Sequence, residues 1–226
     1  MIRYLQRRHF ILSTATAAMV GLCAPAVLAQ ANSKAATTPA RQPVILVLGD
    51  SLSAEYGLAR GTGWVALLEK QLVQEKWAAT VVNASVSGDT TSGGRSRLAA
   101  LLAQHKPSHV VIELGGNDAL RGLPLKNTEE NLAWMTQTAQ KTGAKVLLVG
   151  MQVPPNYGTD YANRFAGLFT TVAQAQRAAV VPFLLKGVAD GPDPTRLFQP
   201  DRIHPRAEAH PQMLANVWPE LKKLMR

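Results

Sequence analysis

The chain has 226 residues, of which 46% are hydrophobic and 17% charged, which suits one α/β domain and excludes disorder over most of the length. Its formal net charge is +9, yet the basic residues are dispersed and aromatic residues make up only 6%, so no nucleic-acid-binding surface is expected. Of the partners that a basic protein attracts, only weak association with an anionic membrane surface is left open.

The first predicted element is an export signal over residues 1–29. It has three arginines and no acidic residue, then an apolar run, and it ends in the small residue Ala29, which suits cleavage by a signal peptidase. The pair Arg7-Arg8 resembles a twin-arginine signal, but such pairs also occur in general secretion signals, so both routes stay open. A periplasmic or secreted location is expected, and residues 30–43, rich in Ala, Thr and Pro, predict a flexible linker.

Strands and helices alternate along the rest of the chain. Apolar runs predict five strands, at residues 44–48, 80–84, 110–114, 145–150 and 180–185. Amphipathic stretches predict helices at residues 64–77, 95–104, 128–141, 161–176 and 208–225. Each parallel crossover needs a connection long enough for a helix, so the pattern predicts one α/β domain over residues 44–226, a five-stranded parallel sheet with helices on both faces.

Ligands of such sheets bind beyond the carboxyl ends of the strands. Ser51 follows the first strand in "GDSLS", where Gly49 lets the chain turn sharply and present the hydroxyl. A serine at this point is also a common helix cap, so Ser51 by itself does not define a nucleophile. It does not lie in the Gly-x-Ser-x-Gly turn of α/β-hydrolases, because Leu52 and Ser53 follow it.

A serine nucleophile needs a base, and the base needs a carboxylate. Asp201 and His204 in "DRIHP" are three residues apart, which places both side chains on one face of a helical turn. The other histidines of the domain have no acid three residues before them and are expected at the surface or in local hydrogen bonds; they are His105, His109 and His210.

Glycine-bearing turns after the second and third strands supply candidate donors for an oxyanion. They contain Gly88 in "SGDT" and Asn117 in "GGND". Gly, Asn and Asp are also common in turns that have no catalytic role. Four such pieces at the same edge of one sheet are nevertheless hard to attribute to turn statistics.

These four segments together resemble the sequence blocks of the SGNH, or GDSL, hydrolase family. The longer agreement in "ELGGNDALRGLP" and "MQVPPNYG" is similar to its bacterial thioesterase, lysophospholipase and arylesterase branch. The resemblance implies a three-layer flavodoxin-like fold, Ser51 as nucleophile, His204 as base and Asp201 as the residue that orients it. It also implies an oxyanion hole formed by the Ser51 N–H with Gly88 and Asn117.

One departure from that branch is Arg202, where glycine is usual. The spacing from Asp201 to His204 is kept, so we expect the triad to survive. Arg202 is then a solvated loop residue, which we favour, or it narrows the entrance of the site or contacts an anionic head group. Its replacement by glycine would leave substrate preference unchanged in the first case.

Apolar loop residues after the third and fourth strands are candidates for an acyl-chain wall, with ordinary loop packing as an equal alternative. They are Leu120, Leu123, Pro124, Pro154, Pro155 and Tyr157.

Bound groups are not expected. The only cysteine, Cys23, lies in the predicted signal, so the exported chain would have no disulfide and no cysteine-based metal site. Asp50 and Glu55 have no histidine nearby and are expected as turn and surface residues rather than metal ligands. The sequence also lacks a His-Glu-x-x-His motif, a phosphate loop and a dinucleotide fingerprint, so neither metal nor cofactor is predicted.

The prediction is an exported serine esterase or thioesterase that acts on small-molecule acyl esters through an acyl-enzyme. Two alternatives are kept. The same triad would serve a carbohydrate O-acetyl esterase, and the same fold would serve a non-catalytic lipid- or glycan-binding domain.

Overall fold

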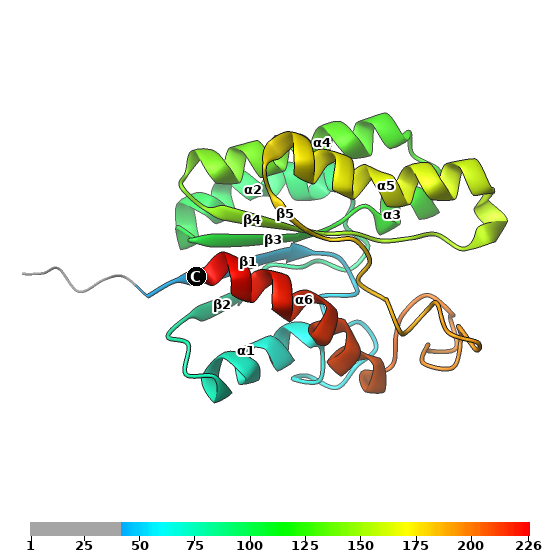
Figure 1. Cartoon of the computed structure of the whole chain (residues 1–226), viewed down its shortest axis with the longest axis horizontal. Helices are drawn as coiled ribbons and strands as arrows, with labels where there is room; N and C mark the ends of the chain where they lie inside the picture. The colour runs from blue at the N-terminus through cyan, green and yellow to red at the C-terminus, as the bar shows by residue number, and fades with distance from the viewer. Residues whose placement is uncertain (1–41) are drawn as a thin grey trace, which may run out of the picture. The chain divides into compact units, whose positions relative to one another are not determined.

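Five parallel strands form the centre of the fold (Figure 1). The computed structural model describes residues 42–226, so the predicted export signal and most of the predicted linker lie outside the described residues. The strands are β1 (Val44–Gly49), β2 (Thr80–Asn83), β3 (His109–Glu113), β4 (Lys145–Val149) and β5 (Ala179–Val181). They pair in the order β2-β1-β3-β4-β5, and every pairing is parallel. The predicted five-stranded parallel sheet is confirmed.

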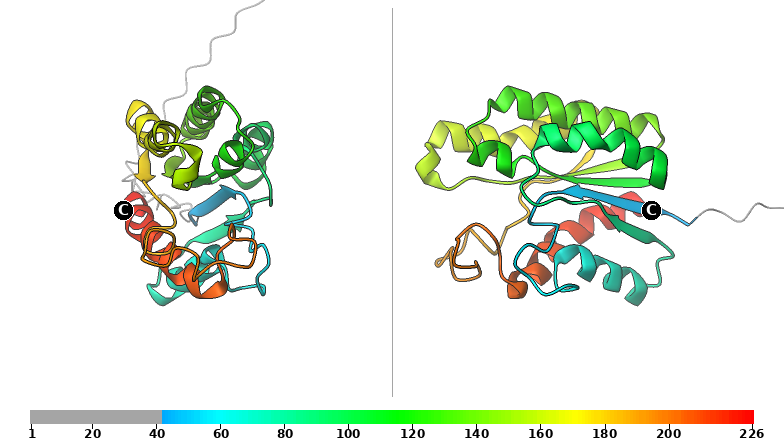
Figure 2. Two further views of the ribbon diagram at one scale, coloured as in Figure 1. Left: turned by 90° about the vertical axis from the view of Figure 1, so that its right-hand side faces the viewer. Right: turned by 180° about the vertical axis from the view of Figure 1, so that it is seen from behind.

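Helices cover both faces of the sheet, as Figure 2 shows. One face carries α1 (Trp64–Gln74) and α6 (His210–Met225), and the other carries α2 (Thr91–His105), α4 (Leu125–Lys141) and α5 (Thr159–Gln176). Side chains of a strand alternate between faces, so Ile45 and Val47 of β1 enter one apolar core while Leu46 and Leu48 enter the other. Burial on both faces explains why β1 reads as a continuous apolar run.

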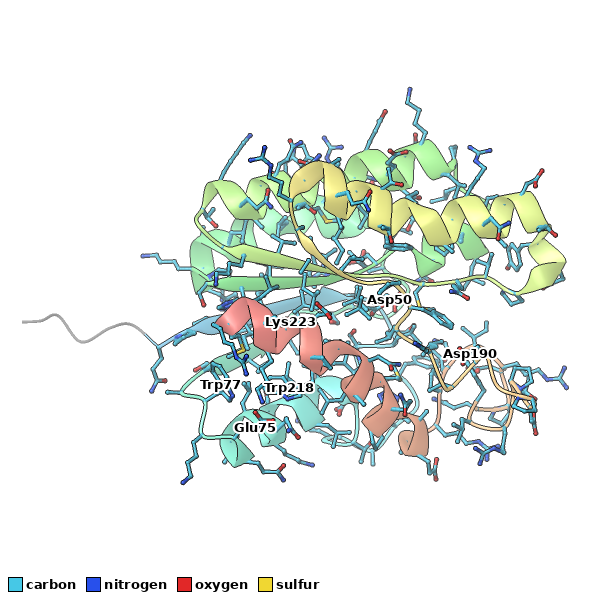
Figure 3. All side chains as sticks on the ribbon, in the orientation of Figure 1. Asp50, Glu75, Trp77, Asp190, Trp218 and Lys223 are labelled. Atoms are coloured by element: carbon cyan, nitrogen blue, oxygen red, sulfur yellow. The ribbon has the colours of Figure 1, made fainter. Side chains whose placement is uncertain are left out.

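The first face is also held by a polar contact between its two helices. Glu75, just after α1, accepts hydrogen bonds from the Trp218 indole (2.9 Å) and the Lys222 ammonium (2.6 Å) of α6. Figure 3 labels Glu75 and Trp218 close to each other on this side of the sheet. Hydrogen bonds from Lys222 first, and then from Gln71 and Trp218, lower the pKa of Glu75 to about 2.

Several element boundaries differ from the prediction. Helix α2 begins at Thr91, four residues earlier than expected, because the Thr90 hydroxyl accepts the Gly93 N–H and caps it. Strand β5 ends at Val181 rather than at residue 185, since Pro182, which follows it, has no N–H to continue the ladder. Helix α4 begins at Leu125 instead of Thr128.

One short helix, α3 (Gly116–Leu120), was not predicted, because Gly115 before it and Gly116 at its start indicate a turn. Asp118 holds it in place: the buried carboxylate accepts the N–H of Thr91 (2.9 Å) and the hydroxyl of Thr128 (3.3 Å). The short helix is thereby tied to the first turns of α2 and α4. The part of the chain that the structure describes also has two 3-10 turns, η1 (Pro155–Tyr157) and η2 (Ala207–Ala209).

The parallel pairing brings the carboxyl ends of the strands to one edge of the sheet. Helix α3, turn η1 and the long segment between β5 and α6 all lie at this end in Figure 1. The Val86 N–H donates to the Gly49 carbonyl (3.0 Å), which places the turn after β2 beside the turn after β1. Within residues 42–226, no helix is long and apolar enough to cross a membrane.

Candidate active site

Three of the predicted residues form a hydrogen-bonded chain at this edge of the sheet. His204 Nδ1 lies 2.7 Å from Asp201 Oδ2, and His204 Nε2 lies 2.9 Å from Ser51 Oγ. An ionised carboxylate can only accept, so the Nδ1–H donates to Asp201 and the Ser51 hydroxyl donates to Nε2. This is the arrangement in which a histidine removes the proton of a serine that attacks a carbonyl.

Asp201 is held by a turn rather than by the helical turn that its spacing suggested. Its Oδ1 accepts the N–H groups of Ile203 and His204, both at 3.0 Å. Arg202 between them has a φ of 57°, in the left-handed region. Partial burial acts to raise the pKa of Asp201, but the hydrogen bonds from His204 and Ile203 outweigh it and lower that pKa to about 2. The carboxylate is therefore ionised at neutral pH.

Two backbone N–H groups beside the serine are free to bind an oxyanion. Within the described chain, neither the Ser51 N–H nor the Gly88 N–H donates a hydrogen bond. Gly88 has a φ of 79°, a conformation that a side chain would strain. Its carbonyl accepts a hydrogen bond from the Arg121 guanidinium (2.8 Å), which fixes the turn from the α3 side.

Asn117, the third predicted donor, is engaged by the protein itself. Its Nδ2 lies 3.0 Å from Asp50 Oδ2 and 3.0 Å from the Asp89 carbonyl. Because an amide nitrogen carries two hydrogens, both are directed at protein acceptors. A contribution of Asn117 to an oxyanion therefore requires that one of these hydrogens be shared with the substrate.

Asp50 is a turn residue, as the sequence indicated, but it is buried rather than exposed. It is 2% exposed, and its Oδ1 accepts the Leu52 N–H at 3.0 Å, so it shapes the turn that carries Ser51. Figure 3 labels it at the carboxyl end of β1. Glu55, which has a φ of 59°, instead organises the following loop, since its carboxylate accepts the N–H groups of Gly61 and Gly63.

Two residues that the sequence analysis missed connect the serine loop to the histidine loop. The ring of Tyr56 lies against the His204 imidazole, with centroids 4.2 Å apart. Gln199 donates from Nε2 to the Tyr56 carbonyl (2.9 Å), and its N–H donates to the His204 carbonyl (2.8 Å). Nothing in the sequence pairs residue 56 with residue 199, so these contacts depend on the tertiary structure.

The predicted wall residues lie on the same edge of the sheet. Leu120 at the end of α3, Leu123 and Tyr157 of η1 are 45%, 36% and 36% exposed. Pro124 and Pro154 are exposed as well, and Pro155 begins η1, although its side chain lies outside what the structure describes.

The remaining histidines stay away from this chain of contacts. His109 and His210 are buried rather than at the surface, and burial lowers the pKa of each. His109 does have the local hydrogen bond that was the other expectation, with the Ser108 hydroxyl (2.9 Å). His210 Nδ1 accepts the Trp64 N–H (3.0 Å) and thereby joins α1 to α6. Among the described residues, no group of three or more His, Cys, Asp or Glu side chains is placed to hold a metal ion.

Comparisons with known proteins identify the family of the chain. The GDSL-like lipase/acylhydrolase family model matches residues 47–211. Esterase TesA of Pseudomonas aeruginosa is 51% identical over 189 residues, which cover 84% of this chain and 92% of TesA. The thioesterase 1/protease 1/lysophospholipase L1 of Escherichia coli is 40% identical, over 74% of this chain and 77% of its own.

A solved structure extends the similarity to the fold. The psychrotrophic esterase EstA from a Pseudoalteromonas species, inhibited by monoethylphosphonate, is 38% identical with a TM-score of 0.75, over 81% of this chain and 99% of EstA. The predicted family and branch are confirmed. The chain therefore belongs to the GDSL-like lipase/acylhydrolase family and is an ester hydrolase of the SGNH type.

Proposed function

We propose that this protein is an exported serine hydrolase that cleaves acyl esters or thioesters through Ser51, His204 and Asp201. The observation that carries the proposal is the continuous chain from Asp201 Oδ2 through both ring nitrogens of His204 to Ser51 Oγ. The export signal is proposed from residues 1–29 of the sequence alone. The names of the relatives, an esterase and a thioesterase with lysophospholipase activity, support the substrate class.

The mechanism follows from the position of each group. Ser51 Oγ attacks the acyl carbonyl as its proton moves to His204 Nε2, and Asp201 stabilises the imidazolium that forms. The N–H groups of Ser51 and Gly88 receive the negative charge on the carbonyl oxygen. The tetrahedral intermediate collapses, and His204 passes the proton to the departing alcohol or thiol. Water then attacks the acyl-enzyme with His204 as base, and the carboxylic acid leaves.

Exposed apolar side chains at the edge of the sheet that carries Ser51 support a substrate with an acyl chain. Of the seven large hydrophobic residues that are exposed in residues 42–226, six follow strands or precede α6 at the carboxyl edge of the sheet; they are Tyr56, Val86, Leu120, Leu123, Tyr157 and Ile203. The seventh, Val73, lies on α1. We call the six the apolar rim. Such a concentration at one edge suits contact with an apolar group of the substrate.

The decisive experiment compares Ser51→Ala with Ser92→Ala, an exposed serine of α2. With p-nitrophenyl butyrate, Ser51→Ala is expected to lower kcat by about 10⁴-fold or more, whereas Ser92→Ala retains the parent rate. Mass spectrometry after treatment with a phosphonate ester should locate the adduct on Ser51. Full turnover by a folded Ser51→Ala protein, or an adduct elsewhere, would refute the assignment.

A further inference from the structure

Two carboxyl groups are buried side by side beneath the turn that carries Ser51. Glu113, the last residue of β3, is 0% exposed, and Asp50, the first residue after β1, is 2% exposed. Gly49 pairs with Glu113 in the sheet, so the two acids lie at the carboxyl ends of neighbouring strands. Neither carboxylate forms an ion pair with a Lys or Arg of the described chain. Two buried anions without a cation would be strongly unfavourable.

Only one of the two carboxyl oxygens of Glu113 accepts hydrogen bonds. Its Oε2 accepts the hydroxyl of Ser53 (2.7 Å) and the N–H of Asp50 (3.4 Å). Ser53 is itself fixed, because its oxygen accepts the Trp64 indole N–H at 3.2 Å. Glu113 Oε1 is buried and has no donor among the described residues. A proton on Oε1 would turn this unpaired acceptor into a donor.

A neighbouring group that can accept such a proton is the Asp50 carboxylate, because the backbone N–H of Asp50 already lies 3.4 Å from Glu113 Oε2. Both oxygens of Asp50 accept hydrogen bonds, Oδ1 from the Leu52 N–H and Oδ2 from the Asn117 amide. An ionised Asp50 carboxylate therefore satisfies both donors without carrying a proton. Burial, the charge of Asp50 and a side-chain hydrogen bond to it raise the pKa of Glu113 well above its ordinary value. Burial also raises the pKa of Asp50, against the opposing effect of its hydrogen bonds.

Besides each other, Glu113 and Asp50 are influenced by two charged groups, His204 and Asp89, and both act on Asp50. His204, from the segment before α6, favours an ionised Asp50, while Asp89, from the turn after β2, opposes it. The charged group that acts on Glu113 is Asp50 itself.

We propose that Glu113 is a positioning residue of the active site, neutral and hydrogen-bonded through its proton to an ionised Asp50, so that the two acids share one proton beneath Ser51. Through Asp50, this proton sets the Leu52 turn that presents Ser51 and the orientation of the Asn117 amide. Its catalytic consequence rests on the function proposed above, whereas the protonation state itself does not.

The first test detects the proton directly. Infrared spectra at about pH 8, where an ordinary glutamic acid is ionised, should show the C=O stretch of a protonated carboxyl in the parent protein. Glu113→Gln should lack this band, and Glu129→Gln, which changes an exposed glutamate of α4, should keep it. A parent protein without the band, or a Glu113→Gln protein that retains it, would overturn the proposal. Neither result depends on ester hydrolysis, so a failure of the proposed function would be recognised separately.

The second test measures proton release on unfolding. An unfolded chain ionises Glu113 near its ordinary pKa, so unfolding of the parent at about pH 8 releases a proton that the folded state holds. Stability consequently falls as pH rises from the unfolded pKa toward the raised folded pKa. The pH dependence of the free energy of urea unfolding should show that Glu113→Gln releases about one proton fewer on unfolding than the parent protein does. Equal proton release in the two proteins would contradict the shared proton.

The catalytic role is tested by comparing a mimic of the neutral acid with a truncation. The Glu113→Gln amide can donate to Asp50 and accept from Ser53 as the neutral acid does, whereas Glu113→Ala removes both the acceptor of the Ser53 hydroxyl and the group that donates to Asp50. We expect kcat of Glu113→Gln to exceed that of Glu113→Ala by about ten-fold, with similar KM values, because only the truncation leaves the Ser53 hydroxyl without its buried acceptor and lets the turn that carries Ser51 shift. Equal kcat values in two folded variants would remove Glu113 from the positioning of the site.

Discussion

The Asp201 carboxylate performs two tasks with its two oxygens. Oδ2 holds the imidazole of His204, and Oδ1 accepts two backbone N–H groups of the same four-residue turn. A spacing of three residues was predicted to bring the acid and the histidine together on a helical turn. The structure reaches the same proximity by a different backbone, in which Arg202 adopts the left-handed conformation. This geometry gives a physical reason for the glycine that is usual at position 202 in the resembled branch.

Replacement of Arg202 by glycine should therefore stabilise the protein. A non-glycine residue in the left-handed region costs about 1–2 kcal/mol, and the added freedom of glycine in the unfolded chain offsets about half of that. We expect Arg202→Gly to raise the free energy of unfolding by about 0.5–1 kcal/mol in urea titrations. Arg196→Gly, an exposed loop arginine without a positive φ, should lower it slightly. A destabilised Arg202→Gly protein would contradict this explanation.

At the scale of elements, the site depends on how closely the ends of strands approach one another. Gly150, directly after β4, donates its N–H to the Val181 carbonyl (2.8 Å), and its own carbonyl accepts the Leu184 N–H (2.9 Å). These bonds set the direction in which the chain leaves β5 toward Asp201 and His204. A Cβ at residue 150 would lie 2.4 Å from the Pro182 carbonyl oxygen, which belongs to the backbone.

Two glycine-to-alanine changes should consequently have opposite effects. Gly150→Ala forces the backbone of β5 away and should lower the free energy of unfolding by about 1–3 kcal/mol. Gly167 lies inside α5, where a Cβ would have no atom within 4 Å, so Gly167→Ala should raise it by about 0.5–1 kcal/mol. Urea unfolding of both variants checks the pair. An unaffected Gly150→Ala protein would show that the segment after β5 adapts without cost.

For the molecule as a whole, the parallel sheet brings the candidate catalytic residues and the exposed apolar side chains to the same edge. Ser51, Gly88 and Asn117 follow three different strands, and the apolar rim comes from the same connections. Strands of a parallel sheet end together, so residues far apart in sequence meet without any local signal. The edge therefore combines a reactive serine with surface suited to an acyl chain.

If the apolar rim binds the acyl group, removing its side chains should lower kcat/KM more for substrates with long acyl groups than for those with short ones. The double variant Leu120→Ser/Tyr157→Ser should lower kcat/KM for p-nitrophenyl octanoate by about five- to ten-fold more than for the acetate. Val73→Ser, at the exposed hydrophobic residue of α1, serves as the control and should change neither value. An unaltered chain-length profile in the double variant would exclude these two residues from the acyl-chain site.

The residues that the sequence did not reveal are those whose roles depend on tertiary contacts. Glu113 lies at the end of an apolar strand, and a lone acid there carries no signal until the structure places Asp50 beside it. Tyr56 and Gln199 lie 143 residues apart and meet only in the folded chain. Helix α3 was missed because glycine disfavours helices locally, whereas Asp118 stabilises this one through contacts with α2 and α4.

The sequence by itself determined the order of the five strands and the five longer helices, the parallel sheet and the family, because apolar periodicity and short motifs are local properties of the chain. The left-handed turn at Arg202, the double engagement of Asn117 and the burial of Asp50 against Glu113 were decided only by the tertiary structure. Each of these depends on groups that belong to different elements. Their hydrogen bonds and protonation states arise only once packing has removed water from between them.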